Sequence, residues 1–193
     1  MRRLPILPTL LVTLAVAAMI ALGLWQLIDR RPAKLAYLAQ VAANPSRPAV
    51  VYPNTPDQAL LLRRASGTCR PPVQVTLAGA GASGFRAIAA CANGMLVQLG
   101  TTRDPMARVA WPGGAVSGFI SHAPDARSLI GALIDRRPQP LMLVADHPLT
   151  GLTANARPDI DAIPNNHLAY GVQWFFFASV ATIIYLLALR RRV

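Results

Sequence analysis

Two long runs without Asp, Glu, Lys or Arg constrain this chain more than any other feature. The first lies between Arg3 and Asp29, and the second lies between Asp161 and Arg190. A helix that crosses a bilayer needs about 20 apolar residues, since it rises about 1.5 Å per residue. Both runs are long enough, and we predict transmembrane helices over residues 4–28 and 166–189.

The first run has an alternative interpretation as a cleaved signal peptide. The apolar part of a signal peptide is usually only about 7–15 residues long. This run is longer, although Ala21-Leu22-Gly23 is a tolerable cleavage site. An uncleaved anchor is therefore favoured, with Trp25 and Trp174 as candidates for an aromatic belt at one membrane interface.

Arginines flank both runs and indicate the orientation. Arg2 and Arg3 precede the first run, and residues 190–192 follow the second. Positive residues in short flanks stay in the cytoplasm, so we predict cytoplasmic termini and an exported segment over residues 30–165. These flanks supply part of the net charge of +11. No nucleic-acid-binding pattern accompanies that charge, so we expect membrane lipids and no nucleic acid as partners.

The exported part, residues 29–163, has the pattern of an α+β domain. A helix is expected after Asp29, with Pro32 in its first turn, and Asp125 could cap another. Short apolar runs bounded by Pro, Gly and Asn predict strands at 49–52, 73–78, 95–100, 108–111, 115–120 and 141–145. The predicted fold class is an α+β membrane protein, with two transmembrane helices flanking a small, mostly antiparallel β domain with one or two helices.

Cys69 and Cys91 are the only cysteines. An oxidising compartment favours their pairing, and they enclose two predicted strands with the turn between them. A disulfide closing such a loop is worth about 3 kcal/mol in the chain-entropy model. Two free thiols, or a metal or redox pair, are the alternatives, but the Cys-x-x-Cys spacing of redox pairs is absent.

The segment Gly79–Gly84 spells the G-x-G-x-x-G dinucleotide fingerprint. That motif needs a helix opening at its third Gly within a parallel crossover. Here the Asn93-Gly94 turn and another predicted strand follow soon afterwards. Glycines in a hairpin connection explain the same letters, and no nicotinamide cofactor is expected.

Residues for catalysis are few. Glu is absent, and Ser121 and His122 are mere sequence neighbours. His122, His147 and His167 are too far apart in sequence to suggest a metal cluster. We expect that the protein is not an enzyme.

His167 stands out because it lies just inside the second apolar run. It follows Asn165-Asn166, either of which can cap a helix, and it shares a helix face with Tyr170, Gly171 and Trp174. An ionisable residue at membrane depth is a functional candidate, and neutral imidazole commonly ligates haem iron. The alternative is an interfacial His hydrogen-bonded to Gln26 or to a lipid headgroup.

Three segments carry a family resemblance. Pro164–Tyr170 followed by Gln173-Trp174-Phe175 resembles the second-helix signature of the Surfeit locus protein 1 family, called Shy in yeast. Leu22–Leu27 with Lys34 beyond is similar to the family's first-helix signature. Leu143–Asp146 followed by Gly151-Leu152 is similar to the stretch before its second helix.

Members of that family assist the assembly of cytochrome c oxidase and are thought to handle haem a for its subunit I. The resemblance therefore implies oxidase subunits, especially subunit I, as partners, and the bacterial or mitochondrial inner membrane as the location. It implies transient haem a contact at His167, the metal ligand, with Tyr170 and Trp174 as the walls of its slot. The positions expected to pack the helices together, or against a partner, are Gly23, Trp25, Gln26, Gly171 and Gln173.

One departure supports a different function. Val97–Thr101 stands where relatives carry an Asn-Arg-Gly-Trp-like run. A permanent accessory subunit of a terminal oxidase or respiratory supercomplex is therefore the alternative to an assembly factor. A membrane-anchored exported binding domain without a haem connection is the third.

Overall fold

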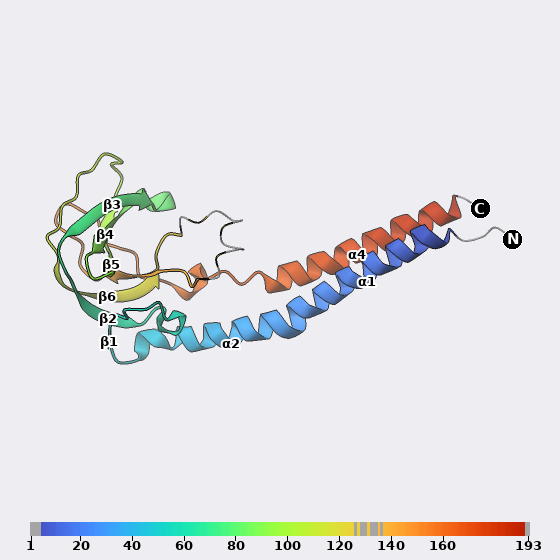
Figure 1. The fold of residues 1–193 in the computed structure, drawn as a ribbon, viewed down its shortest axis with the longest axis horizontal. Helices are drawn as coiled ribbons and strands as arrows, with labels where there is room; N and C mark the ends of the chain where they lie inside the picture. Colours follow the sequence, from blue (N-terminus) through green and yellow to red (C-terminus); the bar gives the residue numbers. More distant parts are fainter. Residues whose placement is uncertain (1–4, 126, 128–130, 132–134, 136, 192–193) are drawn as a thin grey trace. The chain divides into compact units, whose positions relative to one another are not determined.

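Helix α1 (Ile6–Trp25) continues directly into helix α2 (Arg31–Ala42) through a π-helical turn, Gln26–Arg30, in the computed structural model (Figure 1). The structure describes residues 5–191 except 126, 128–130, 132–134 and 136. Pro32 lacks an N–H, and its ring crowds the carbonyl four residues earlier. A π-turn is one way in which a helix accommodates such a defect. The expected separate helix after Asp29 is thus a continuation of the first.

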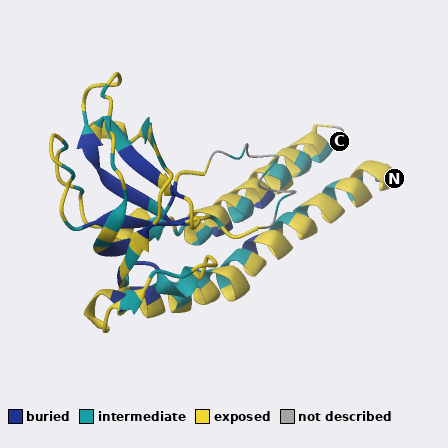
Figure 2. Ribbon diagram, turned by 60° about the vertical axis from the view of Figure 1, so that its left-hand side comes forward, coloured by how far each residue is buried: buried dark blue, intermediate teal, exposed yellow. Residues whose placement is uncertain are grey.

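Helix α4 (His167–Arg190) runs antiparallel to α1. Near the start of α1, the hydroxyl of Thr9 contacts that of Tyr185, and near its end Gln26 meets His167. Apart from the narrow stripe of contact, most residues of both helices are exposed (Figure 2). Both helices are long and apolar enough to cross a membrane.

The chain divides into two units. The helical unit comprises Met1–Leu38 and Ile163–Val193, and the sheet unit comprises Ala39–Ala162. The exported domain over residues 29–163 stays a prediction. The first turns of α2 belong to the helical unit, because they extend α1 through the π-turn.

The sheet unit holds seven strands in the order β1-β2-β6-β7-β5-β4-β3. The β1–β2 and β5–β7 pairs are parallel and the other four are antiparallel. The predicted fold class, two apolar helices flanking a mostly antiparallel sheet, is confirmed. The strands are β1 (Val50–Val51), β2 (Arg64–Cys69), β3 (Val73–Gly79), β4 (Phe85–Cys91), β5 (Leu96–Thr102), β6 (Gly114–His122) and β7 (Leu141–Ala145).

Five of the six predicted strands are present, and the run at 141–145 coincides with β7. The strand predicted at 108–111 is wrong, because those residues pair with no strand among the described parts of the chain. Pro105 and Pro112 flank them and lack the N–H that a ladder requires. Strands β2 and β4 were not predicted, and the helix expected after Asp125 lies largely outside the described residues.

The glycine-rich segment forms the tip of the β3–β4 hairpin. A short 3₁₀ turn, Gly81–Ser83, joins two antiparallel strands. Gly84 has φ +80°, and a Cβ there would lie 2.5 Å from the carbonyl oxygen of Thr102. The hairpin interpretation is therefore confirmed. A dinucleotide motif would need a helix where β4 stands.

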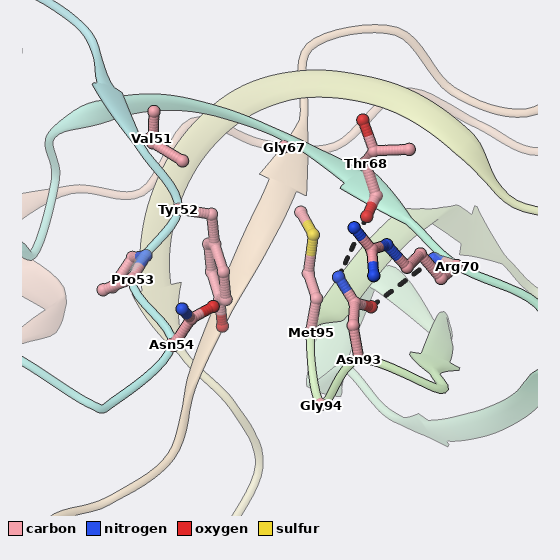
Figure 3. A pocket seen from close by; sticks show the side chains of 10 residues that line it. All are labelled: Val51, Tyr52, Pro53, Asn54, Gly67, Thr68, Arg70, Asn93, Gly94 and Met95. Carbon is pink, nitrogen blue, oxygen red and sulfur yellow. Dashed lines mark hydrogen bonds between the residues drawn. The ribbon is translucent and has the colours of Figure 1, made fainter.

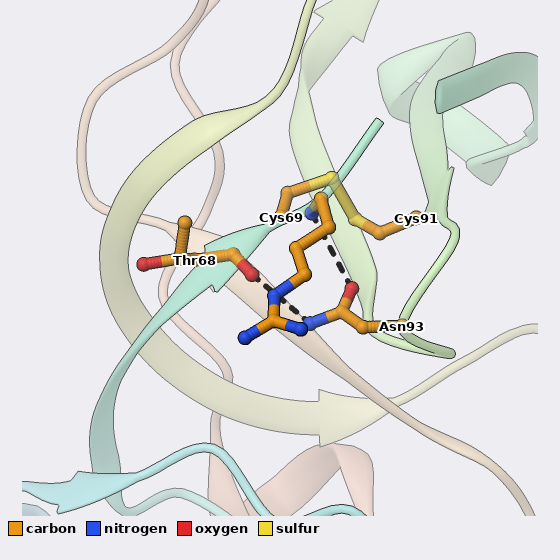
Figure 4. Close-up of a disulfide and its surroundings, with 5 residues drawn as sticks. Thr68, Cys69, Cys91 and Asn93 are labelled. Carbon is orange, nitrogen blue, oxygen red and sulfur yellow. Dashed lines mark hydrogen bonds between the residues drawn. A yellow bond between two sulfur atoms is a disulfide. The ribbon is translucent and has the colours of Figure 1, made fainter. Parts of the chain in front are cut away.

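The sheet curls until its distant strands meet at one end. Cys69 at the end of β2 and Cys91 at the end of β4 form a disulfide with a Cα–Cα distance of 5.3 Å (Figure 4). Three strands separate β2 from β4 in the sheet order. Beside the disulfide, the amide of Ala92 donates to the carbonyl of Arg70 at 2.9 Å. The expected disulfide is thus present, and it links opposite sides of an open barrel.

The core lies on both sides of β7, whose five residues are all buried. Burial on both faces of the strand explains the continuous run Leu-Met-Leu-Val-Ala. One buried cluster comprises Ile88, Ala123, Met142 and Val144.

Candidate functional site

His167 is the first residue of α4 and lies beside the end of α1. Its Nδ1 atom is 2.7 Å from Oε1 of Gln26. An amide oxygen only accepts hydrogen bonds, so the imidazole must donate through Nδ1–H. In the neutral ring, Nε2 then keeps its lone pair. This is the form in which proteins present histidine to metals, with a second residue fixing the tautomer.

Two glycines let the helices come close enough for this hydrogen bond. A Cβ on Gly23 would lie 2.9 Å from the ring of Phe175, and one on Gly171 would lie 2.7 Å from Cδ2 of Leu27. Small residues allow such approaches between helices in membranes. Gly23 precedes Gln26 by about one turn, and Gly171 follows His167 by about one turn. The glycine contacts therefore set the distance across which Gln26 reaches His167.

The other positions singled out in the sequence lie elsewhere on the helices. Tyr170 is 51% exposed and Gln173 is also exposed. Neither side chain makes a hydrogen bond to another described residue. Trp174 is half-buried and packs edge-on against Phe177 at 6.3 Å. The ring of Trp25 lies 5.0 Å beneath the guanidinium of Arg30.

The structure thus brings together Gly23, Gln26, His167 and Gly171. It places Tyr170 away from the helix contact, because the stripe facing α1 follows the four-residue spacing from His167 to Gly171. Neither expected Asn caps α4 with its side chain, although Asn166 occupies the N-cap position. The Oδ1 atom of Asn165 is buried without a hydrogen-bond partner in the described parts of the chain, which the sequence did not suggest.

The other two histidines belong to the sheet unit. Nε2 of His122 lies 2.7 Å from Oε1 of Gln58, and His147 is exposed after β7. Within the described residues, no three His, Cys, Asp or Glu side chains gather as a metal site. His167 remains the candidate ligand, acting singly.

The sheet unit carries a cleft of about 330 Å³ next to the disulfide (Figure 3). Tyr52 and Met95 line it on opposite sides, and Arg70 lies at its edge. The Tyr52 hydroxyl donates to the Leu141 carbonyl at 2.6 Å. Burial of the hydroxyl raises the pKa of Tyr52 to about 12, so this phenol stays neutral at physiological pH. Its role is to join the strand ends.

The disulfide holds the wall of this cleft in place. The Asn93 side chain accepts from the Arg70 amide at 3.4 Å and donates to the Thr68 carbonyl at 3.0 Å (Figure 4). These residues adjoin the two cysteines in the sequence. The sequence predicted the disulfide, but it did not predict the cleft, because Tyr52 and Met95 come from separate segments.

Comparison with known proteins gives one family match, and it covers most of the chain. The sequence model of the SURF1 family matches residues 13–179, which include most of both apolar helices and the whole sheet unit. No curated protein and no solved structure matches the chain. Proteins of this family are membrane-bound, are known as assembly factors of cytochrome c oxidase and are not enzymes. A match over most of its length shows that the chain belongs to the SURF1 family.

Proposed function

We propose that this protein assists the assembly of cytochrome c oxidase by contacting haem a at His167 during delivery to subunit I. The observation that carries the proposal is the hydrogen bond from Nδ1 of His167 to Gln26, which leaves Nε2 free to bind iron. The family's link to haem a insertion supplies the identity of the group.

The residues present suit a haem iron. The porphyrin supplies four nitrogen ligands of its own, so one neutral imidazole is enough to bind the haem iron to the protein. Trp174, two turns beyond His167, offers a half-buried aromatic ring, and the exposed apolar surface of α4 suits a hydrophobic macrocycle. Haem a, when bound, supplies the redox chemistry of the oxidase. The chain's own residues only hold and orient it.

We further propose that both termini are cytoplasmic and that residues 30–165 are exported across the inner membrane of a bacterium, or of a mitochondrion. The arginines before the first helix and after the second support this orientation. Reporter domains fused after Leu60 and after Val193 should then report opposite compartments. Reporters on the same side would contradict the proposed topology.

Affinity purification in mild detergent, with subunit identification and haem spectra, tests the assembly role. We expect the tagged protein to be recovered with subunit I that lacks other subunits, because an assembly factor leaves the finished enzyme. Stoichiometric recovery with complete oxidase would contradict this and indicate a permanent accessory subunit. Recovery of no oxidase subunit would indicate a membrane-anchored binding domain of another kind.

A further inference from the structure

A second cleft in the sheet unit has a basic lining. Its volume is about 340 Å³, and it lies where β2, β6 and β7 meet the segment that follows β7. The side chains that matter for its chemistry are Arg64, Phe119, Asp146, His147 and Arg157. It shares no lining residue with the cleft beside the disulfide.

Two guanidinium groups stack on the ring of Phe119. The Cζ atoms of Arg64 and Arg157 lie 5.0 Å and 5.5 Å from the ring centroid. Arg64 is neutralised, since its Nη2 is 2.6 Å from Oδ2 of Asp146. In contrast, Arg157 makes no hydrogen bond or ion pair with any described residue. One positive charge in the cleft is therefore uncompensated.

The backbone that carries Arg157 is fixed to the sheet. Thr153 exchanges two hydrogen bonds with Thr101, at 2.8 and 2.9 Å. The Asn155 amide donates to the carbonyls of Ala145 and Gln98, and it accepts from the Gln98 side chain at 2.8 Å. Two residues further along, Arg157 rests on Phe119. The backbone beside Arg157 is thus held in place before any ligand arrives, which reduces the entropy cost of binding.

We propose that this cleft binds a carboxylate group through Arg157. The guanidinium lies over Phe119, is exposed and has no polar partner among the described residues, and its N–H groups match the two oxygens of a carboxylate. A carboxylate carries one negative charge and balances the single uncompensated Arg. A phosphate dianion would remain partly unbalanced, because Asp146 already neutralises Arg64. The carboxylate belongs either to an acidic side chain of a partner polypeptide or to a free small molecule.

This proposal is independent of haem contact at His167, because every residue that carries it belongs to the sheet unit. A test on Arg157 therefore fails or succeeds without reference to the helical site.

Side-chain NMR of the full-length protein in detergent, labelled with ¹⁵N-arginine, tests the proposal directly. We expect the Nε–H signal of Arg157 to shift saturably with sodium propionate at constant ionic strength. Propionamide, a neutral analogue of the same shape, should leave it unchanged. Arg108 is a matched control, since it is exposed and does not line this cleft. Its signal should not move. Arg157→Gln assigns the signal, and Arg108→Gln should leave propionate binding unaltered.

Two tetrapeptides, acetylated at the N-terminus and amidated at the C-terminus, distinguish the sources of the carboxylate. One carries a single Glu and the other, the control, carries Gln in its place. A half-saturating concentration at least tenfold lower for the Glu peptide than for propionate indicates a partner polypeptide. Equal concentrations indicate a free small carboxylate. The proposal is overturned if neither propionate nor the Glu peptide saturates the Arg157 signal. It is also overturned if propionamide shifts that signal equally.

Discussion

At the scale of single residues, the important question is which nitrogen of His167 carries the proton. The sequence offered two interpretations, a functional ligand or an interfacial His bonded to Gln26. The structure contains the hydrogen bond to Gln26 that the second interpretation expected. The same hydrogen bond is also compatible with a ligand role and supports it. Because Gln26 occupies Nδ1, Nε2 remains available.

We predict that the ¹⁵N spectrum of His167 shows the Nδ1–H tautomer in the wild-type protein. Gln26→Leu keeps a similar volume but removes the acceptor, so this variant should give a mixture of both tautomers. Gln173→Leu is the control, because the Gln173 side chain is exposed and bonds to no described residue. A wild-type ring protonated at Nε2, or an unchanged tautomer in Gln26→Leu, would refute the assigned role of Gln26.

His167 and Gln26 were identified from the sequence, and Tyr170 as a wall of the haem slot stays a prediction. The structure shows only that Tyr170 lies outside the contact between the helices. Residues three and four positions apart both neighbour a given helical residue, so the pattern alone cannot choose between Tyr170 and Gly171. The choice depends on which side of α4 the partner helix approaches. Gly171 determines that side, since a Cβ there would collide with Leu27.

At the scale of helices, the glycine contacts should control the pairing of α1 with α4. Gly171→Leu places a side chain where Leu27 already lies, and overpacking of this kind costs about 1–3 kcal/mol. We expect a several-fold slower disulfide cross-link between cysteines introduced at Thr9 and Tyr185, whose side chains touch at the other end of the pair.

Ala169→Leu is the matched control for that variant. Ala169 lies on the exposed side of the same turn, so the added volume should leave the rate of cross-linking unchanged. Equal rates in the two variants would show that Gly171 does not set the spacing of the helices.

At the scale of strands, the disulfide should stabilise the open barrel. Removing both sulfurs in Cys69→Ala/Cys91→Ala releases a connection between residues 22 positions apart, worth about 3 kcal/mol in the chain-entropy model. Urea unfolding followed by fluorescence of Trp111, the only Trp in the sheet unit, should show a lower midpoint. Reductant should shift the wild-type midpoint similarly. Equal midpoints with and without the disulfide would contradict this account.

Strands were predictable where local composition reflects burial. Strand β7 was found because its apolar run is buried on both faces. Strand β4 was missed because Phe-Arg-Ala-Ile-Ala-Ala-Cys is rich in alanine, which favours helices. Its pairing with β3 and β5 overrides that preference. The run at 108–111 has strand-forming residues but pairs with no strand among the described residues, and a strand needs such a partner.

At the scale of the whole molecule, the order of an apolar helix, a sheet unit and a second apolar helix was predictable from hydropathy alone. The strand order was not predictable. Pairs such as β2 with β6 join segments about 50 residues apart in sequence, and local sequence patterns do not indicate which distant segments pair. The clefts beside the disulfide and around Phe119 escaped prediction for the same reason. Each is built from side chains that only long-range pairing brings together.

The most direct test of the central claim is the reduced-minus-oxidised spectrum of membranes from cells in which the native gene has been deleted. Cells supplied with wild-type protein should show the full haem a band. Those supplied with His167→Ala should lose most of it, while the amount and topology of the variant protein stay normal. A full haem a band with His167→Ala would contradict the claim that this imidazole handles haem a.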